Sequence, residues 1–369
     1  MRGVFRTEPD ADAIKKVAGH AAAFSAFRAS APALLEGHYA TGRLGIDAAL
    51  YGDAARDALR RPDRIGEAEA LSFFERHFRC LSVMPLEDEA RSTGFVTGYY
   101  EPEVAASRVP TDSFRHPLYA RPTDLVAVDD VTRPAGLDKG FTFARRFSCG
   151  LMTDYPDRAA IEAGFLKGRG LEIAYVRDEV EAFFIHVQGS ARLRFADGTA
   201  TRIGYAAKTG HPFTAIGRVL VETGALTLAE ADMDGIRDYL AKHPDQVRPV
   251  LDRNRSFIFF AERPIDDAET GPVGAATVPL TPLASLAVDR ELATFGVPYL
   301  VTAPELHLDG APFARLMIAQ DTGSAIVGAA RGDIFVGSGA AAGRGAGRIR
   351  HEAHLTLLAP PALAARLVP

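Results

Sequence analysis

The spacing of apolar residues divides the chain into a helical beginning and a β-rich remainder. In the segment PDRIGEAEALSFFERHF, apolar side chains recur at intervals of three and four residues from Leu71 to Phe78, which predicts one apolar face of a helix. Glu75 and Arg79 stand four residues apart, the spacing of an ion pair on such a helix. Together with the alanine-rich stretches before it, this pattern predicts that residues 1–90 are largely helical.

After Ser92 the chain becomes rich in β-branched and aromatic residues between glycines and prolines. The segment TGFVTGYYEPEV therefore predicts a strand and a loop. From Glu181 onward, EAFFIHVQGSARLRFADGTATRIGY is interpreted as successive strands, with a tight hairpin turn at Asp197 and Gly198. A helical insert follows, opened by the capping box of Thr227 and Glu230.

From Ser256 to the C-terminus, short apolar runs bounded by Gly, Pro or Asp dominate the sequence. They read SFIFFAE, AATVPL, VPYLVTA, RLMIAQD, DIFVGSG and HLTLLAP, and each has the length of a strand. Many short strands with such punctuation predict a small β-barrel or sandwich. The stretch Gly337–Gly347 is biased towards Gly, Ala and Arg, but it is too short for a linker between domains.

Composition narrows the function classes. The chain has 369 residues, 47% of them apolar, and a net charge of −5, so a basic nucleic-acid-binding face is not expected. No apolar run approaches the ~20 residues of a membrane span. The first residues show no secretory hydrophobic region and no lipid-attachment cysteine, which leaves a cytoplasmic protein or a missing export segment. Cys80 and Cys149 are predicted to be buried thiols.

Several familiar catalytic motifs are incomplete in this sequence. HEAH (His351–His354) lacks the i,i+4 histidine pair of a zincin, and the Gly337–Gly347 stretch lacks the Gly-Lys-Ser/Thr of a phosphate loop. One D-T-G string at Asp321–Gly323 has no second copy, which argues against an aspartic protease. The G-x-S-x-G motif is missing as well, so no serine hydrolase is indicated.

Two aspartates, Asp321 and Asp333, stand beside glycines in apolar, strand-like sequence. Burial of a carboxylate is costly unless something pairs with it or uses it. Asp333 lies between Gly332 and the run Ile334–Val336, an apolar setting that would raise its pKa. Taken alone, either aspartate could instead be a turn residue, and Gly323 makes this reading strong for Asp321.

A set of ordered motifs resembles the lytic murein transglycosylase A (MltA) family. The motifs are TGYYEP (Thr97–Pro102), YPDRAAIEAG (Tyr155–Gly164), HVQGSARLRFADG (His186–Gly198), YAAKTGHPFTAIGRVLVETG (Tyr205–Gly224), RSFIFFAE (Arg255–Glu262), VPLTPLASLAVDR (Val278–Arg290) and QDTGSAIVGAARGDIFVGSG (Gln320–Gly339). The last of them is similar to what is called the 3D domain. The resemblance covers most of the chain from about Thr97 onward, and residues 1–90 share it more weakly.

The resemblance implies a fold that is mainly β with a helical N-terminal region. A double-psi β-barrel is expected from 1–103 and 264–369, and a second, β-rich glycan-binding domain is expected to be inserted at 104–263. A groove between the two domains would hold a glycan strand.

The resemblance also implies a reaction. The family cleaves the bond between N-acetylmuramic acid and N-acetylglucosamine in peptidoglycan, and the muramyl 6-hydroxyl attacks its own anomeric carbon to give a 1,6-anhydro product. One aspartate then suffices as acid and afterwards as base, because no catalytic water has to be activated. No metal or other cofactor is expected.

The family's catalytic acid corresponds to Asp333, and Asp321 is the second candidate, either catalytic or a partner that orients Asp333. The residues expected to line the substrate groove are Thr97, Gly98, Tyr99, Tyr100, Gln188, Gly189, Ser190 and Lys208. Because adjacent side chains of a strand point to opposite faces, one of the two tyrosines is expected to face the groove while the other packs inward.

Two other functions remain open from the sequence. A barrel of this kind could bind peptidoglycan without cleaving it, or the protein could be a hydrolytic muramidase that uses water as the nucleophile. The expected partners are peptidoglycan strands and other cell-wall enzymes, not nucleic acid, and the protein is expected to be a monomer. The resemblance implies a periplasmic, outer-membrane-associated location.

Overall fold

The computed structural model describes residues 3–8, 10, 12–86, 93–265, 270–308 and 310–368. The chain divides into two compact units, Met1–Tyr100 with Asp267–Pro369 and Glu101–Asp266. Parts of the region predicted to be helical, namely 1–2, 9, 11 and 87–90, lie outside the described residues. The domain boundaries expected from the sequence stay a prediction.

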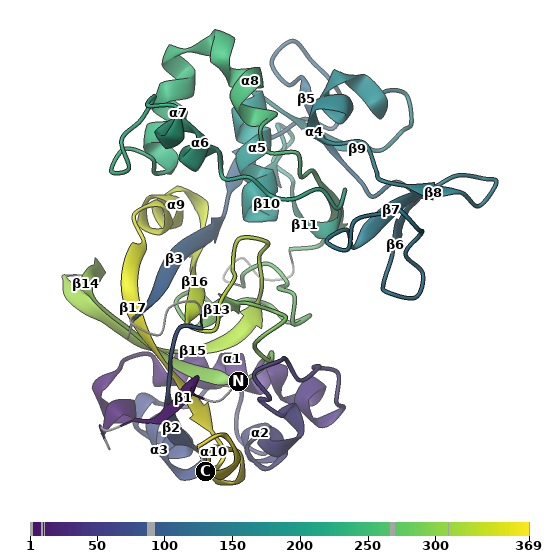
Figure 1. Cartoon of the computed structure of the whole chain (residues 1–369). Coiled ribbons are helices and arrows are strands. Elements are labelled where there is room, and N and C mark those ends of the chain that lie inside the picture. The colour runs from purple at the N-terminus through teal and green to yellow at the C-terminus, as the bar shows by residue number, and fades with distance from the viewer. Residues whose placement is uncertain are drawn as a thin grey trace. The chain divides into compact units, whose positions relative to one another are not determined.

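The first unit is built on a closed β-barrel (Figure 1). Its strands are β3 (Gly94–Glu101), β13 (Ser285–Val288), β14 (Pro298–Leu308), β15 (Ala311–Asp321), β16 (Arg331–Ser338) and β17 (Arg350–Ala359). They follow one another as β17-β14-β15-β13-β16-β3, and β3 pairs again with β17 to close the ring. Strand β13 runs parallel to β15 and antiparallel to β16. The predicted fold class, a double-psi barrel with a second domain, is confirmed.

Helices cover the end of this barrel that contains both chain termini (Figure 1). They are η1 (Ala13–Lys16), α1 (His20–Leu35), η2 (Ala48–Tyr51), α2 (Gly52–Leu59), α3 (Glu67–His77) and α10 (Pro361–Leu367). Helix α1 is bonded to the barrel by buried Gln320 of β15, whose amide donates to Ala26 O at 2.8 Å and to Ser30 Oγ at 2.9 Å. Buried aromatic rings of α1 and α3 pack edge to face between the helices.

The prediction of a helical beginning is correct for α1, α2 and α3 and wrong for two short strands. Strands β1 (Phe5–Thr7) and β2 (Arg79–Val83) extend the barrel sheet beyond β17. Phe78 adopts an extended backbone conformation and ends the helix. Arg79 therefore lies outside the helix and cannot form an i,i+4 ion pair with Glu75. The carboxylate of Glu75 lies 3.7 Å from Lys15 instead.

The second unit contains three small sheets. They have the orders β12-β11-β10-β4, β5-β9 and β6-β7-β8. Their strands are β4 (Glu103–Ala105), β5 (His116–Tyr119), β6 (Leu125–Ala127), β7 (Phe143–Arg146), β8 (Met152–Thr153), β9 (Glu172–Val176), β10 (Ser190–Arg194), β11 (Ala200–Lys208) and β12 (Ile258–Arg263). The predicted hairpin turn joins β10 to β11, with Gly198 at φ 84° and the Asp197 carboxylate accepting from Thr199 N at 2.8 Å.

The helices of the second unit are α4 (Arg158–Ala160), the π-helix η3 (Ile161–Phe165), α5 (Glu179–Gln188), α6 (Ile216–Glu222), α7 (Met233–Lys242), η4 (Pro244–Gln246) and α8 (Val247–Leu251). The predicted helical insert is therefore present. The Glu230 carboxylate accepts from the backbone N–H and the hydroxyl of Thr227, at 2.9 and 2.7 Å, but the cap of α7 is Asp232.

Helix α5 corrects the prediction that the chain is a strand from Glu181. Asp178 caps the helix by accepting from Glu181 N at 2.7 Å, and left-handed Gly189 ends it. Two separate apolar clusters bury α5, since Ile185 packs with the β10–β11 sheet and Phe184 packs with α6 to α8. A helix buried on both sides shows a continuous apolar run, which periodicity cannot distinguish from a buried strand.

Two further predictions, for the run AATVPL and for the two cysteines, are wrong within the described residues. The run AATVPL forms a loop, in which Thr277 takes a positive φ of 61°, rather than a strand. The glycine-rich stretch after β16 forms helix α9 (Gly339–Gly347). Cys149 is exposed in a tight turn and Cys80 is partly exposed, so the thiols are not both buried. No helix in the described part of the chain is long and apolar enough to cross a membrane.

Candidate active site

The side chains of the candidate site come from strands β3, β15 and β16 of the barrel, and β13 lies between β15 and β16. Ala287 of β13 is in register with Asp321 of β15 on one side and with Asp333 of β16 on the other. Strand β3 follows β16 in the barrel and contributes Thr97 and Tyr99, which share one face because they are two residues apart. The barrel therefore brings together both predicted aspartates and two of the predicted groove residues.

A short chain of hydrogen bonds ends on Asp333. The hydroxyl of Thr97 donates to Asp333 Oδ1 at 2.6 Å, and an Arg331 guanidinium nitrogen donates to Thr97 Oγ1 at 2.7 Å. Because the threonine oxygen accepts from a cation, its own proton is directed at the carboxylate and is polarised towards it. Arg331 thereby fixes the direction of the hydrogen bond that Asp333 receives.

The environment of Asp333 raises its pKa to about 6. Burial is the largest cause, since the protein atoms around the carboxyl remove most of its hydration and disfavour the charged form. The positive charge of Arg331 and the Thr97 hydrogen bond oppose this rise, and Asp321 adds slightly to it. Part of the side chain stays accessible to solvent. A partly exposed carboxyl with a pKa of about 6 keeps a fraction of its proton near neutral pH and can act as a general acid.

Asp321 occupies a different set of contacts. Its Oδ2 accepts from the Tyr99 hydroxyl at 2.8 Å, and its Oδ1 accepts from Ala275 N at 2.9 Å. Burial raises the pKa of Asp321, and these two hydrogen bonds work against that rise. The Tyr99 ring lies 5.4 Å from the ring of Phe335, which holds the phenol in place. Asp321 thus links Tyr99 to the loop before β13, and this contact set is compatible with either of its two predicted roles.

The two adjacent tyrosines do point to opposite faces of β3. A Cβ on Gly343 of α9 would come within 2.7 Å of the Tyr100 ring, so Tyr100 packs against this helix. A Cβ on Gly98 would likewise lie 2.8 Å from Ile349 and 3.0 Å from the backbone of Ala346. Gly98 and Tyr100 therefore hold α9 on β3, and a role in substrate binding stays a prediction for both.

The remaining predicted groove residues belong to the second unit. Gln188 ends α5, Gly189 is its left-handed cap at φ 77°, and buried Ser190 begins β10. Lys208 stands at the end of β11, in register with Ile258 of β12. The first three thus share one helix-to-strand junction, whereas Lys208 lies on another strand. Their assignment to the substrate stays a prediction.

Sequence reasoning missed Arg331. It precedes Asp333 by two residues in a strand, so the two side chains share a face, and this spacing was a usable signal. The described residues contain no group of three or more His, Cys, Asp or Glu side chains placed to hold a metal ion. His351 and His354 of the HEAH string lie on β17 three residues apart, which puts them on opposite faces.

Comparison with known proteins gives consistent matches across both units. Residues 95–261 match the model of the MltA specific insert domain, and residues 284–359 match that of the 3D domain. The crystal structure of a membrane-bound lytic murein transglycosylase from Agrobacterium tumefaciens is 44% identical, with a TM-score of 0.87 over 98% of this chain and 99% of that one.

Two more distant relatives agree with these matches. Escherichia coli MltA with bound chitohexaose is 26% identical, with a TM-score of 0.70 over 98% of this chain and 95% of that one. A curated relative from Vibrio cholerae, named membrane-bound lytic murein transglycosylase A, is 33% identical over 262 residues, or 69% of this chain. The chain spans 62% of the length of that relative.

Proposed function

Because the chain belongs to the lytic murein transglycosylase A family, we propose that it cleaves peptidoglycan strands between N-acetylmuramic acid and N-acetylglucosamine without adding water. The observation that carries the proposal is the partly accessible carboxyl of Asp333, which accepts from Thr97 and whose pKa is raised to about 6. A relative crystallised with bound chitohexaose supports a glycan strand as the ligand. The protein would then work in the periplasm, where this substrate lies, and would need no cofactor.

In the proposed reaction Asp333 acts twice. The protonated carboxyl first donates its proton to the glycosidic oxygen, and the bond from that oxygen to the anomeric carbon of the muramyl residue breaks. The muramyl 6-hydroxyl then bonds to the same carbon and releases its proton to the Asp333 carboxylate, which gives a 1,6-anhydro end and restores the acid. General acid–base help of this kind contributes roughly 10²–10⁴-fold to a rate.

The neighbouring residues have distinct proposed roles. Thr97 and Arg331 position the carboxyl of Asp333 and keep its pKa from rising further, because both favour its charged form. Asp321 positions Tyr99, whose ring and hydroxyl offer a flat apolar face and a polar edge for a sugar. Gln188, Gly189, Ser190 and Lys208 are proposed to contact the glycan from the second unit.

Mass spectrometry of the muropeptides released from purified sacculi tests the proposed function. We expect anhydromuramyl ends, because the nucleophile belongs to the substrate. Release of reducing ends would show a hydrolytic muramidase, with Asp321 as the candidate base. No release, in the presence of measurable binding to sacculi, would show a non-catalytic binding protein.

The Thr97→Val variant should shift the pH profile of the reaction. The acid must be protonated before it can donate, so activity of the native protein should be lost as the pH rises through about 6. Removing a hydrogen bond that favours the carboxylate raises the pKa further, and the falling limb of kcat/KM should move to higher pH.

The conservative variant Thr97→Ser keeps the hydroxyl and should retain the native profile. Thr93→Val is a matched control, because Thr93 donates to Glu352 at 3.2 Å and does not contact Asp333. A shift of the Thr97→Val profile to lower pH would mean that Arg331 pairs directly with Asp333 once the threonine is gone, and would contradict the assigned role of Thr97.

A further inference from the structure

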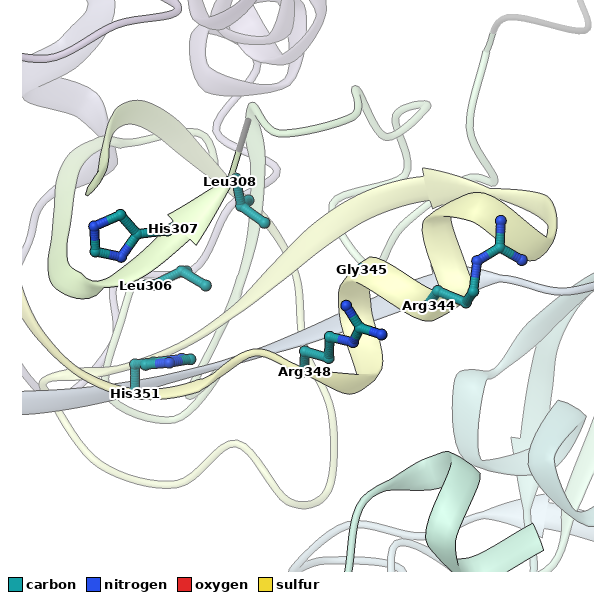
Figure 2. A pocket seen from close by; sticks show the side chains of 7 residues that line it. All are labelled: Leu306, His307, Leu308, Arg344, Gly345, Arg348 and His351. Carbon is teal, nitrogen blue, oxygen red and sulfur yellow. The ribbon is translucent and has the colours of Figure 1, made fainter. Parts of the chain in front are cut away.

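A basic pocket lies in the first unit, formed by α9 and the strands β14 and β17 (Figure 2). Its volume is about 380 Å³, within the range of small-ligand sites. The residues that line it are Leu306, His307, Leu308, Arg344, Gly345, Arg348 and His351. None of these lining residues is acidic, although the chain as a whole carries a net charge of −5.

The two arginines of the pocket are available to a ligand. Arg344 lies on α9 and Arg348, four residues later, caps its C-terminus, and both side chains extend from the same side of the helix (Figure 2). Both are exposed, and neither guanidinium forms a hydrogen bond or ion pair with any residue that the structure describes. His307 and His351 add imidazole nitrogens at the other end of the pocket (Figure 2).

We propose that this pocket binds the free carboxylates of a peptidoglycan stem peptide. The planar fork of an arginine matches a carboxylate in two parallel hydrogen bonds. Two arginines at i,i+4, with Cβ atoms about 6 Å apart, can each bind one carboxylate of the same peptide. Leu306 and Leu308 supply apolar contacts for the aliphatic chain between these groups.

The position of the pocket suits a peptide attached to a glycan at the proposed active site. Helix α9 begins directly after β16, the strand of Asp333, and packs on Gly98 and Tyr100 of β3. The neighbours Thr97 and Tyr99 face the aspartates. An extended tetrapeptide spans up to about 14 Å, which sets the greatest distance from the glycan at which its last carboxylate can be bound. The identity of the ligand therefore rests on the proposed function. The basic character of the pocket does not depend on it.

Direct titration of the full chain tests the pocket independently of catalysis. The probes are a synthetic stem tetrapeptide with free carboxylates, the same peptide with its carboxylates amidated, and inorganic phosphate. We expect the free-carboxylate peptide alone to bind in calorimetry, and Arg344→Gln and Arg348→Gln each to weaken it about tenfold or more. Arg76→Gln is the matched control, because Arg76 is exposed on α3 and does not line the pocket.

Three results would overturn the inference. They are failure of the peptide to bind, equal binding of the amidated peptide, and phosphate binding as tightly as the peptide. Cleavage assays separate this failure from failure of the proposed function. The native protein and both arginine variants are assayed on glycan strands that carry stem peptides and on strands that lack them. If the native protein cleaves both substrates and the variants show the same ratio of the two rates, the pocket proposal falls and the function stands. If the native protein cleaves neither substrate but the peptide binds as expected, the function falls and the pocket stands.

Discussion

The Asp333→Asn variant is expected to release no detectable anhydromuropeptides from sacculi while it still binds them. Asparagine cannot donate a proton to the glycosidic oxygen or take one from the 6-hydroxyl, so both halves of the proposed reaction are lost. The rate should fall by at least about 10²–10⁴-fold, the usual contribution of general acid–base catalysis. The measurement is the yield of anhydromuropeptides over time, together with a sedimentation assay for binding to sacculi.

The stability of Asp333→Asn shows whether the loss of activity reflects chemistry. The pKa of Asp333 is raised from 3.8 to about 6 by folding, so the ionised carboxylate destabilises the native state above pH 6. This penalty is absent below the unfolded pKa of 3.8, where the group is protonated in both states. The variant should therefore melt at the same or a higher temperature than the native protein at pH 8, with a smaller difference at pH 4. Normal turnover by a folded variant would refute the assignment of Asp333.

Asp321→Asn is the comparison that separates the two carboxylates. It should reduce activity less completely than Asp333→Asn, because Asp321 contacts Tyr99 and Ala275 rather than the proton chain of Thr97. An equal loss from both substitutions would instead mean that the aspartates act as a coupled pair.

Most of the barrel strands could be predicted because each contains a short apolar run bounded by turn-forming residues, but β13 was missed. Strands β14 to β17 match four of the six apolar runs of the C-terminal part. The error at α5 has a physical cause: a helix between two cores loses the polar stripe that would distinguish it from a strand. Helix α9 was not predicted, because its glycines lower helix propensity, although Gly343 allows the close approach of the Tyr100 ring.

Most members of the candidate site were predictable, but Arg331 and the geometry of the site were not. The two aspartates and the TGYY segment could be singled out from sequence patterns and family resemblance. The register of β3, β16 and β13 decides which aspartate each residue of β3 contacts. That register is set by pairing between strands far apart in the sequence, not by local sequence. Tyr99 reaches Asp321, whereas Thr97 contacts Asp333, and no sequence spacing indicates that choice.

One buried ion cluster could have been predicted from the hairpin. The Asp197–Gly198 turn sets the register so that Arg192 stands directly opposite Arg202. Two like charges in such a pair destabilise a sheet unless an anion lies between them. The anion is Glu101, at the end of the TGYYE segment, which is fully buried and accepts from Arg192 Nε at 2.7 Å and from Arg202 Nε at 2.5 Å.

The Glu101→Gln variant is accordingly expected to cause the largest loss of stability among single substitutions of charged residues in the second unit. A neutral amide removes the negative charge to which both arginine side chains, only 12% and 6% exposed, donate. Removing one partner of a buried ion cluster costs about 3–5 kcal/mol, which lowers Tm on the order of 10 °C in a domain of this size. Thermal unfolding followed by circular dichroism measures the shift.

Glu103→Gln provides the matched control for this prediction. Glu103 pairs with Arg194 two residues further along both strands, in the same type of carboxylate–guanidinium contact, but its side chain is 29% exposed and that of Arg194 is 66% exposed. Solvent then compensates either partner, so the expected loss is within about 1 kcal/mol. Equal melting temperatures for the two variants would show that burial does not set the strength of the Glu101 cluster. A loss confined to Glu101→Gln would show that the anion is required because the hairpin register places two arginines side by side.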